Sequence, residues 1–516
     1  MIIKILLLIV FFAVMLYIGY YSRHQAKTVE GYVLGGRNVG PWISAFAYGT
    51  SYFSAVVFVG YAGQFGWRYG LASTWIGIGN AVIGSLLAWI ILGRRTRVMT
   101  KHMNSATMPA YFESRYDSKT LKIVASAIIF IFLIPYTASV YNGLSNLFEM
   151  AFGIPYIYCV CMMAVLTCVY VLMGGYTATV YNDFVQGIIM LLGIVIVILS
   201  VLNGHGGFMN AVRQLSEIPS DNPITMGQQG AFASFFGPDP VGLLYVIILT
   251  SLGTWGLPQM VQKFYAIKSE KAVATGTIVS TFFAVVIAGG SYFLGGFARL
   301  IDVSLVSKTN PDGTLAMMYD HVMPQLLSNL PDILMGVLIV LIMSASMSTL
   351  SSLVLTSSST MTLDFLKGTV MKKMTEKQQL WWLRAFVIFF IVISVAIAMN
   401  PPTFIAQLMG ISWGALAGAF LAPFMYGLYW KGVTKAAVWV SFIYGVGLTV
   451  ANMYTAWMSP IQAGAIAMLG GLVLVPVVSL LTPKMDKAMV DGIFACYDVE
   501  VDTTTKNRLP DEEDVD

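Results

Sequence analysis

Apolar runs long enough to cross a lipid bilayer recur along almost the whole chain. A transmembrane helix needs about 20 predominantly apolar residues to span roughly 30 Å of hydrocarbon. Of the 516 residues, 57% are hydrophobic and 10% are charged, whereas a soluble domain carries about 25% charged residues. We therefore expect an all-α polytopic membrane protein with about thirteen transmembrane helices, near residues 3–20, 41–65, 73–93, 121–150, 155–173, 178–202, 239–262, 274–299, 326–360, 383–399, 403–428, 437–457 and 461–482.

The loops between these runs differ in their content of basic residues. If the first run crosses from outside to inside, most of the 29 Lys and Arg residues fall in inward loops or in the tail, Lys263 among them. Because cytoplasmic loops are enriched in basic residues, this predicts an outside amino terminus and a cytoplasmic carboxyl terminus in the plasma (cell inner) membrane. We expect one transmembrane domain over residues 1–482 and a cytoplasmic tail over 483–516, whose acidic end at 511–514 is solvated.

Two of the predicted helices contain polar and glycine-rich interruptions. The second run is broken by residues 47–54, and the seventh, five runs later, is broken by residues 250–258 with Gly256 and Pro258. Interrupted helices at corresponding places in two halves are typical of secondary transporters built from inverted repeats. Non-helical backbone at membrane depth is tolerated where it lines a cavity. The matched interruptions predict two discontinuous helices around a binding site.

Small hydroxyl residues replace bulky apolar ones in the ninth run. Ala345, Ser348, Thr349 and Ser352 are three or four residues apart, so they share one helix face. One interpretation is close helix packing, in which each hydroxyl bonds to a carbonyl of its own helix. The other is a set of oxygen ligands for an alkali cation. The pattern alone leaves both open.

At these residues the chain resembles the sodium/solute symporter family. The motifs that carry the resemblance are Leu34-Gly35-Gly36-Arg37, Gly174-Gly175-Tyr176-Thr177-Ala178 with Asn182-Asp183-Phe184, Gly256-Leu257-Pro258-Gln259, and Ser346-Met347-Ser348-Thr349-Leu350. The run from Tyr52 to Ala55, together with Gly256-Leu257-Pro258, looks closer to the branch of the family that carries pantothenate and small carboxylates than to the proline branch. The resemblance implies a five-plus-five inverted repeat, with core repeats at about 41–202 and 239–428, one helix before them and two after.

The resemblance also implies cation sites, with sodium as the bound ion. The principal sodium site would use carbonyls in the second helix and a carbonyl and two hydroxyls in the ninth, namely Thr50, Phe53, Ala345, Ser348 and Thr349. Such neutral oxygens suit a monovalent ion, since Ca²⁺ and Mg²⁺ sites recruit carboxylates. Asp183, Ser351 and Ser352 would form a second sodium site. The alternative for Asp183 is a capping residue at a helix end.

The solute is expected between the two broken helices, at positions matching Tyr52, Ser54, Tyr136, Thr250, Thr254 and Trp255, with Asn80 and Asn142 as further polar candidates. Proline carriers of the family have an aspartate where Tyr52 stands and aromatic residues at Thr250 and Thr254. We therefore favour a small carboxylate such as pantothenate or a monocarboxylate, and keep proline as the alternative. The threonines could instead satisfy the broken helix backbone.

Other classes of protein fit the sequence less well. The four histidines lie in loops and form no spacing motif, so an intramembrane enzyme is disfavoured. A cation channel would not need paired broken helices. The net charge of +4 comes from the inward loops, so no nucleic-acid partner is expected. The expected partners are a small-molecule solute, sodium and the lipid bilayer, without an obligatory protein partner.

Overall fold

The computed structural model describes residues 2–309, 315–328, 330–400 and 405–497. These residues are mostly helical. A short hairpin joins β1 (Ser307–Thr309) to β2 (Leu315–Met317) in antiparallel register, with Ser307 opposite Met317. The predicted acidic end at 511–514 lies outside the described residues. The all-α architecture expected from the sequence is confirmed.

The first five-helix repeat begins with a broken helix. Its elements are α3 (Pro41–Tyr52), η3 (Val56–Tyr61), α4 (Ala62–Tyr69), η4 (Gly70–Ser73), α5 (Thr74–Gly79), η5 (Asn80–Leu87), η6 (Trp89–Gly93), α6 (Arg94–His102), α7 (Met108–Tyr116), α8 (Lys119–Phe152) and α9 (Tyr156–Gly204). Pro41 is the first residue of α3, where a backbone N–H would have no hydrogen-bond partner within the helix, so the missing N–H of proline costs nothing. The helix ends at Tyr52, because Phe53 adopts extended backbone angles.

The second repeat also begins with a broken helix. Its elements are α11 (Pro240–Gly256), α12 (Pro258–Ala266), α13 (Glu270–Ala284), η8 (Val285–Gly289), α14 (Gly290–Gly295), α15 (Tyr319–Leu327), α16 (Asp332–Ser359), η11 (Thr360–Leu366), α17 (Lys367–Thr369), α18 (Glu376–Met399) and α19 (Ile405–Tyr429). Leu257 separates α11 from α12, which meet at 46°. Pro258 cannot continue the hydrogen bonding of α11. Both predicted discontinuities are therefore confirmed.

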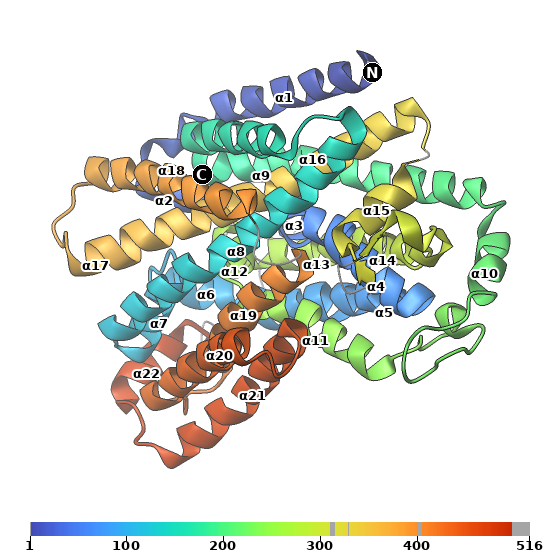
Figure 1. Ribbon diagram of the computed structural model, residues 1–516. Coiled ribbons are helices and arrows are strands. Elements are labelled where there is room, and N and C mark those ends of the chain that lie inside the picture. The colour runs from blue at the N-terminus through green and yellow to red at the C-terminus, as the bar shows by residue number, and fades with distance from the viewer. Residues whose placement is uncertain (1, 310–314, 329, 401–404, 498–516) are drawn as a thin grey trace, which may run out of the picture.

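The remaining elements flank the repeats. They are α1 (Ile2–Ser22), η1 (Gln25–Lys27), α2 (Val29–Leu34), η2 (Gly35–Arg37), α10 (Phe208–Ser216), η7 (Ala231–Ala233), η9 (Ala298–Leu300), η10 (Val303–Leu305), α20 (Lys435–Thr455), α21 (Pro460–Leu481), α22 (Lys487–Phe494) and η12 (Ala495–Tyr497). Figure 1 shows α1 along one edge of the bundle, α20 and α21 toward the opposite edge, and α3 near the centre. The start of the tail is ordered, since Lys431 Nζ lies 2.7 Å from Asp491 Oδ1 on α22.

Ten stretches of the described residues are long and apolar enough to cross a membrane, or eleven with the bent α11–α12 pair. Two of these stretches contain 47 and 49 residues, or about 70 Å of helix, which is more than twice the hydrocarbon thickness. Each turns at a glycine with positive φ, Gly70 and Gly175. When each is counted as two crossings, the described residues hold the thirteen predicted from the sequence.

Glycines allow the two repeats to approach closely. A Cβ on Gly66 of α4 would lie 1.8 Å from the carbonyl oxygen of Gly295 in α14, and a Cβ on Gly295 would lie 2.2 Å from the carbonyl oxygen of Ala62. Small residues at helix contacts are the usual means of tight packing inside a membrane. The contact holds the helix that follows the first break against the second repeat.

Candidate functional site

The break after α3 leaves a backbone carbonyl facing α16. The Thr50 carbonyl oxygen accepts hydrogen bonds from Ser348 Oγ at 3.0 Å and from Thr349 Oγ1 at 3.3 Å. Because the chain leaves the helix at Phe53 and resumes it at Val56, this carbonyl is bonded from a different helix. Ser54 Oγ accepts the amide of Val56 at 3.1 Å and so caps the resumed helix. The break is stabilised by side chains on both of its sides.

The same two hydroxyls also face a second carbonyl. Ser348 Oγ and Thr349 Oγ1 each lie 3.1 Å from the Ala345 carbonyl oxygen. A hydroxyl has a single proton to donate, so at any moment two hydroxyls make two of these four bonds. The oxygens of Thr50, Ala345, Ser348 and Thr349 therefore share only two hydroxyl protons and keep lone pairs that are free to bind a cation. Such a set of neutral oxygens, without a carboxylate, suits a monovalent cation.

Phe53, the fifth predicted ligand, lies beside this group. Phe53, Ser54 and Ala345 line one small cavity of about 10 Å³, which is close to the volume that a single water molecule requires. Thr50, Ser348 and Thr349 are fully buried. By contrast, Ser346 on the same helix bonds only within it, to the Ile342 carbonyl at 2.8 Å. The structure thus brings the five predicted positions together, and their role as sodium ligands stays a prediction.

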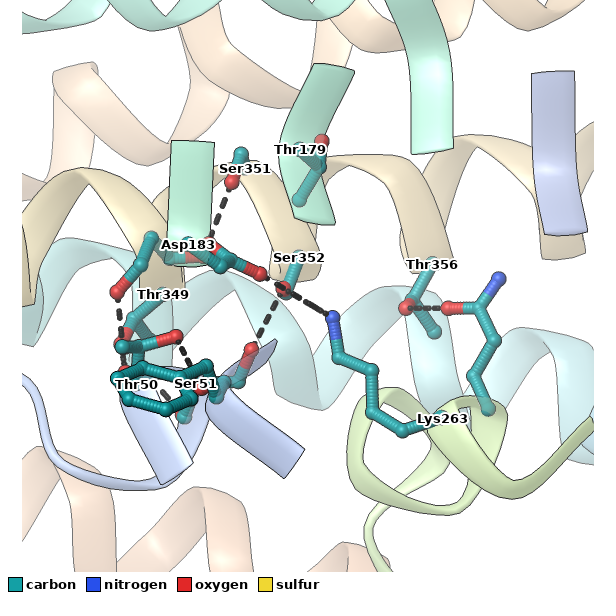
Figure 2. A network of polar contacts seen from close by, with 12 residues as sticks. Thr50, Ser51, Thr179, Asp183, Lys263, Thr349, Ser351, Ser352 and Thr356 are labelled. Atoms are coloured by element: carbon teal, nitrogen blue, oxygen red, sulfur yellow. Dashed lines mark hydrogen bonds and ion pairs between the residues drawn. The ribbon is translucent and has the colours of Figure 1, made fainter. Parts of the chain in front are cut away.

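Of the three residues of the predicted second site, Ser351 and Ser352 lie one turn farther along α16 and Asp183 lies on α9. A lysine lies next to Asp183 and Ser352. Lys263 Nζ on α12 is 3.6 Å from Asp183 Oδ2 on α9 and 3.0 Å from Ser352 Oγ. Ser352 Oγ is 2.8 Å from Ser51 Oγ, which follows Thr50 in α3. Figure 2 shows Lys263 extending from its helix toward Asp183 and Ser352, to the right of the segment that carries Thr50 and Ser51. Ser351 Oγ bonds to the Ser348 carbonyl at 2.9 Å.

Lys263 corrects one part of the sequence analysis. The loop count placed it among the basic residues of an inward loop, but Lys263 lies within α12, the second half of the broken helix, and its side chain is 1% exposed. Asp183 is 0% exposed. Lys263 follows Pro258 by five residues, so the sequence could have assigned it to the second half of the broken helix, but not to the neighbourhood of Asp183 and Ser352.

The predicted solute residues gather where the two broken helices meet. Tyr52 Oη donates to the Thr250 carbonyl at 2.6 Å, and Trp255 Nε1 donates to the Ile83 carbonyl at 2.9 Å. The threonine hydroxyls bond to backbone: Thr250 Oγ1 to Val246 at 2.9 Å, and Thr254 Oγ1 to Gly84 at 3.1 Å. These bonds match the interpretation in which the threonines satisfy local backbone, so their contact with solute stays a prediction.

Several buried polar atoms of the described residues make no well-formed hydrogen bond, although Tyr136 faces Trp413 and Tyr292 faces Asn80 near this junction. Tyr136 Oη was predicted for the site and Asn80 was a further candidate, whereas four such residues were missed: Tyr61, Gln64, Tyr292 and Trp413. The Trp413 ring lies 6.2 Å from Tyr52 and 5.9 Å from Tyr136, between ring centroids. Buried polar groups are normally paired, so a cluster of unpaired ones indicates a place for a polar ligand. Three of these four are single aromatic residues in apolar helices and Gln64 is a single amide, so the sequence held no pattern that identified them.

Asn142 and Asn80 are held by neighbours. Asn142 Oδ1 accepts from Tyr156 Oη, and Asn80 Oδ1 accepts from Ser251 Oγ at 3.2 Å. The Ala398 carbonyl lies 2.7 Å from the same Tyr156 hydroxyl and is the alternative acceptor of its one proton. Asn142 therefore helps to connect α8, α9 and α18, while Asn80 keeps its amide nitrogen unpaired at the junction.

The Leu34-Gly35-Gly36-Arg37 motif fixes the segment that precedes α3. Gly35, Gly36 and Arg37 have φ angles of 61°, 68° and 54°, a left-handed turn that glycine adopts without strain. Arg37 Nη2 donates to the Ser105 carbonyl at 2.7 Å, and Nη1 donates to the Tyr265 carbonyl of α12 at 3.3 Å. Burial lowers the pKa of the Arg37 guanidinium, with Arg97 adding to the effect and Glu30 opposing it. The motif therefore attaches the start of one broken helix to the end of the other.

Comparison with known proteins agrees with this architecture. Residues 32–445 match the sodium:solute symporter family. The sodium/proline symporter 2 of Staphylococcus saprophyticus is 30% identical over 465 residues, covering 89% of this chain and 87% of the relative. The sodium/proline symporter of Staphylococcus aureus is 30% identical over 499 residues, covering 93% and 92%.

Two solved structures share the fold. A substrate-bound, outward-open Na⁺-coupled sialic acid symporter aligns with a TM-score of 0.73 at 18% identity, over 94% of this chain and 98% of that chain. A nucleobase-cation-symport-1 family transporter in a closed conformation aligns with a TM-score of 0.51 at 15% identity, over 90% and 98%. The relatives are secondary transporters rather than enzymes. The chain is a multi-pass membrane transporter and belongs to the sodium:solute symporter family.

Proposed function

We propose that this protein is a sodium-coupled symporter that imports a small carboxylate-bearing solute by alternating access. The observation that carries the proposal is the convergence of two hydroxyls and two carbonyls at the break of α3, where Ser348 Oγ lies 3.0 Å from the Thr50 oxygen. Sodium would take up the surplus acceptor capacity of these oxygens. The family and the sodium-coupled relatives support sodium as the coupling ion.

The coupling follows from the alternation of residues in one short segment. Thr50 and Phe53 would offer carbonyls to sodium, while Tyr52, between them, bonds to the Thr250 carbonyl at the solute junction and Ser54, after them, would contact the solute. An ion that orders this segment lowers the free energy needed to order it for solute, so each ligand raises the affinity for the other. Binding of both would then favour the conformational change that carries them across.

The solute class is inferred from the groups at the junction. The unpaired atoms there are hydroxyl, amide and indole groups of Tyr61, Tyr136, Tyr292, Asn80 and Trp413, which can hydrogen-bond a carboxylate or other polar solute. We favour pantothenate or a monocarboxylate. Proline is the second candidate, because relatives 30% identical over most of the chain are sodium/proline symporters.

We further propose that the transporter lies in the plasma membrane, with the amino terminus outside and the carboxyl terminus cytoplasmic. The basic residues of the inward loops support this orientation. The Arg37 motif and α22 would then lie on the cytoplasmic side. Cysteine accessibility at the two termini of the full-length protein would test the orientation.

Uptake in proteoliposomes tests the proposed function. Purified protein receives labelled pantothenate, lactate or proline under an inward sodium gradient, with a choline gradient as control. Saturable uptake of a carboxylate that stops when the sodium gradient is collapsed is the expected result. Sodium-independent uptake, or a non-saturating sodium conductance, would overturn the symport proposal. Sodium-driven proline uptake that excess pantothenate and lactate leave unchanged would replace the favoured solute with proline.

A further inference from the structure

A buried lysine amine lies one helical turn from the proposed sodium site. Lys263 Nζ is 3.6 Å from Asp183 Oδ2, donates to Ser352 Oγ at 3.0 Å, and lies 5.2 Å from the centre of the Tyr176 ring. The lysine and aspartate side chains are 1% and 0% exposed. Charged groups are costly within a membrane protein, and those present are normally paired and functional.

The amine occupies the space between groups that a cation would use. Asp183 and Ser352 are two of the three residues of the predicted second sodium site, and both lie next to Lys263 Nζ. Ser351, the third, directs its hydroxyl to the Ser348 carbonyl. A sodium ion bound to Asp183 and Ser352 would be beside an ammonium group, and like charges in a buried site repel strongly.

The amine also joins three helices that meet at the proposed transport site. Lys263 belongs to α12, Asp183 to α9 and Ser352 to α16. Through the 2.8 Å contact between Ser352 Oγ and Ser51 Oγ, the network reaches the end of α3 beside Thr50. Figure 2 shows this continuous set of contacts from Lys263 to the segment of Thr50 and Ser51. A fixed cation here can hold α12 against the scaffold without an ion from solution.

We propose that Lys263 is a built-in cation that replaces a second sodium at Asp183 and Ser352, so that this protein binds one sodium per transport cycle. This inference rests on the proposed sodium coupling at Thr50, Ala345, Ser348 and Thr349. Lys263 is thus a residue that sets stoichiometry, acting through Asp183 rather than by contact with solute. Removing the amine while keeping the carboxylate would recreate a site for sodium.

Binding of ²²Na⁺ to the purified full-length protein tests this without knowledge of the solute. The protein is titrated with ²²Na⁺ in choline chloride, and moles bound per mole are compared in wild type, Asp183→Asn, Lys263→Met and the double variant. The expected counts are one in wild type, one in Asp183→Asn, two in Lys263→Met and one in the double variant. Lys263→Arg, which keeps a positive charge, should bind one.

The counts separate the possible failures. Two sodium ions in wild type, falling to one in Asp183→Asn, would overturn the proposal and identify Asp183 as part of an ordinary second site. A count of one in a folded Lys263→Met protein would also overturn it. If Lys263→Met does not fold, the wild-type and Asp183→Asn counts decide between the two assignments. If wild type binds no sodium, the result counts against the proposed function instead. The double substitution Ser348→Ala/Thr349→Ala should abolish sodium binding when it is made in the wild-type protein, but should leave one bound ion when it is made in the Lys263→Met protein.

Discussion

Tyr52 Oη donates a hydrogen bond to the Thr250 carbonyl oxygen at 2.6 Å across a separation of 198 residues. The donor is the last residue of α3 and the acceptor lies in α11, so one bond connects the two discontinuous helices. Both residues are buried. Movement of either broken helix relative to the other must therefore break or redirect this bond.

Tyr52→Phe removes the hydroxyl and keeps the ring that stacks on Phe53 at 4.1 Å. A buried hydrogen bond contributes about 0.5–1.5 kcal/mol, so we expect a roughly three- to tenfold loss of solute affinity in sodium-driven uptake. Tyr426→Phe is the matched control, because Tyr426 Oη bonds to the Leu472 carbonyl at 3.0 Å between α19 and α21. Equal uptake constants in the two variants would contradict the role of Tyr52 at the junction.

Ser348→Ala/Thr349→Ala removes both hydroxyls at the proposed sodium site but leaves the Thr50 and Ala345 carbonyls. We expect the sodium concentration for half-maximal uptake to rise more than tenfold, because two of the five proposed oxygens are lost. The control is Ser346→Ala, whose hydroxyl bonds only to Ile342 of its own helix. The initial rate of solute uptake, measured as a function of sodium concentration, checks this. If the double variant and the control show the same sodium dependence, Ser348 and Thr349 are not sodium ligands.

The positions of the two helix breaks could be predicted because local chemistry determines them. Pro258 cannot donate the bond that would continue α11, and Ser54 supplies a cap for the helix that resumes after Phe53. The polar face of α16 could be predicted from the three- and four-residue spacing of Ala345, Ser348 and Thr349. Both features depend on residues that are close together in the sequence, so the sequence alone predicts them.

Lys263 and Trp413 could not be placed from the sequence, because their surroundings come from distant segments. Lys263 lies near the end of an apolar run, where a lysine usually reaches the membrane surface, yet the tilt of α12 directs it to Asp183. Trp413 lies among apolar residues and meets Tyr52 and Tyr136 only when α19 packs against the first repeat. Tertiary packing alone distinguishes these side chains from ordinary ones.

Gly66→Ala tests the close approach of α4 and α14. The new methyl group would lie 1.8 Å from the Gly295 carbonyl oxygen, and backbone on both sides leaves no flexible side chain to move. Overpacking of this kind destabilises by about 1–3 kcal/mol, so we expect a lower melting temperature in fluorescence thermal unfolding. In the control Gly447→Ala, a Cβ meets nothing within 4 Å on α20, and a helical alanine should be neutral or more stable by about 0.5–1 kcal/mol. Equal melting temperatures for the two variants would show that the contact is looser than described.

Asp320 predicts a pH dependence of stability with a defined sign. Its carboxylate accepts the Ile405 amide at the start of α19 at 3.2 Å, and burial raises the pKa of Asp320 to about 6 although this amide opposes the shift. Since the folded protein binds the proton more tightly than the unfolded chain, the cost of burying the charged carboxylate is full above about pH 6 and disappears as the pH falls toward 3.8.

Asp320→Asn keeps an acceptor for Ile405 without the charge, so it should be more thermostable than wild type at pH 7, by a margin that shrinks at pH 5. Asp302→Asn is the control, because the Ser304 amide holds the pKa of the exposed Asp302 below its usual value, and its effect should be the same at both pH values. A margin for Asp320→Asn that is constant from pH 7 to pH 5 would show that Asp320 titrates normally.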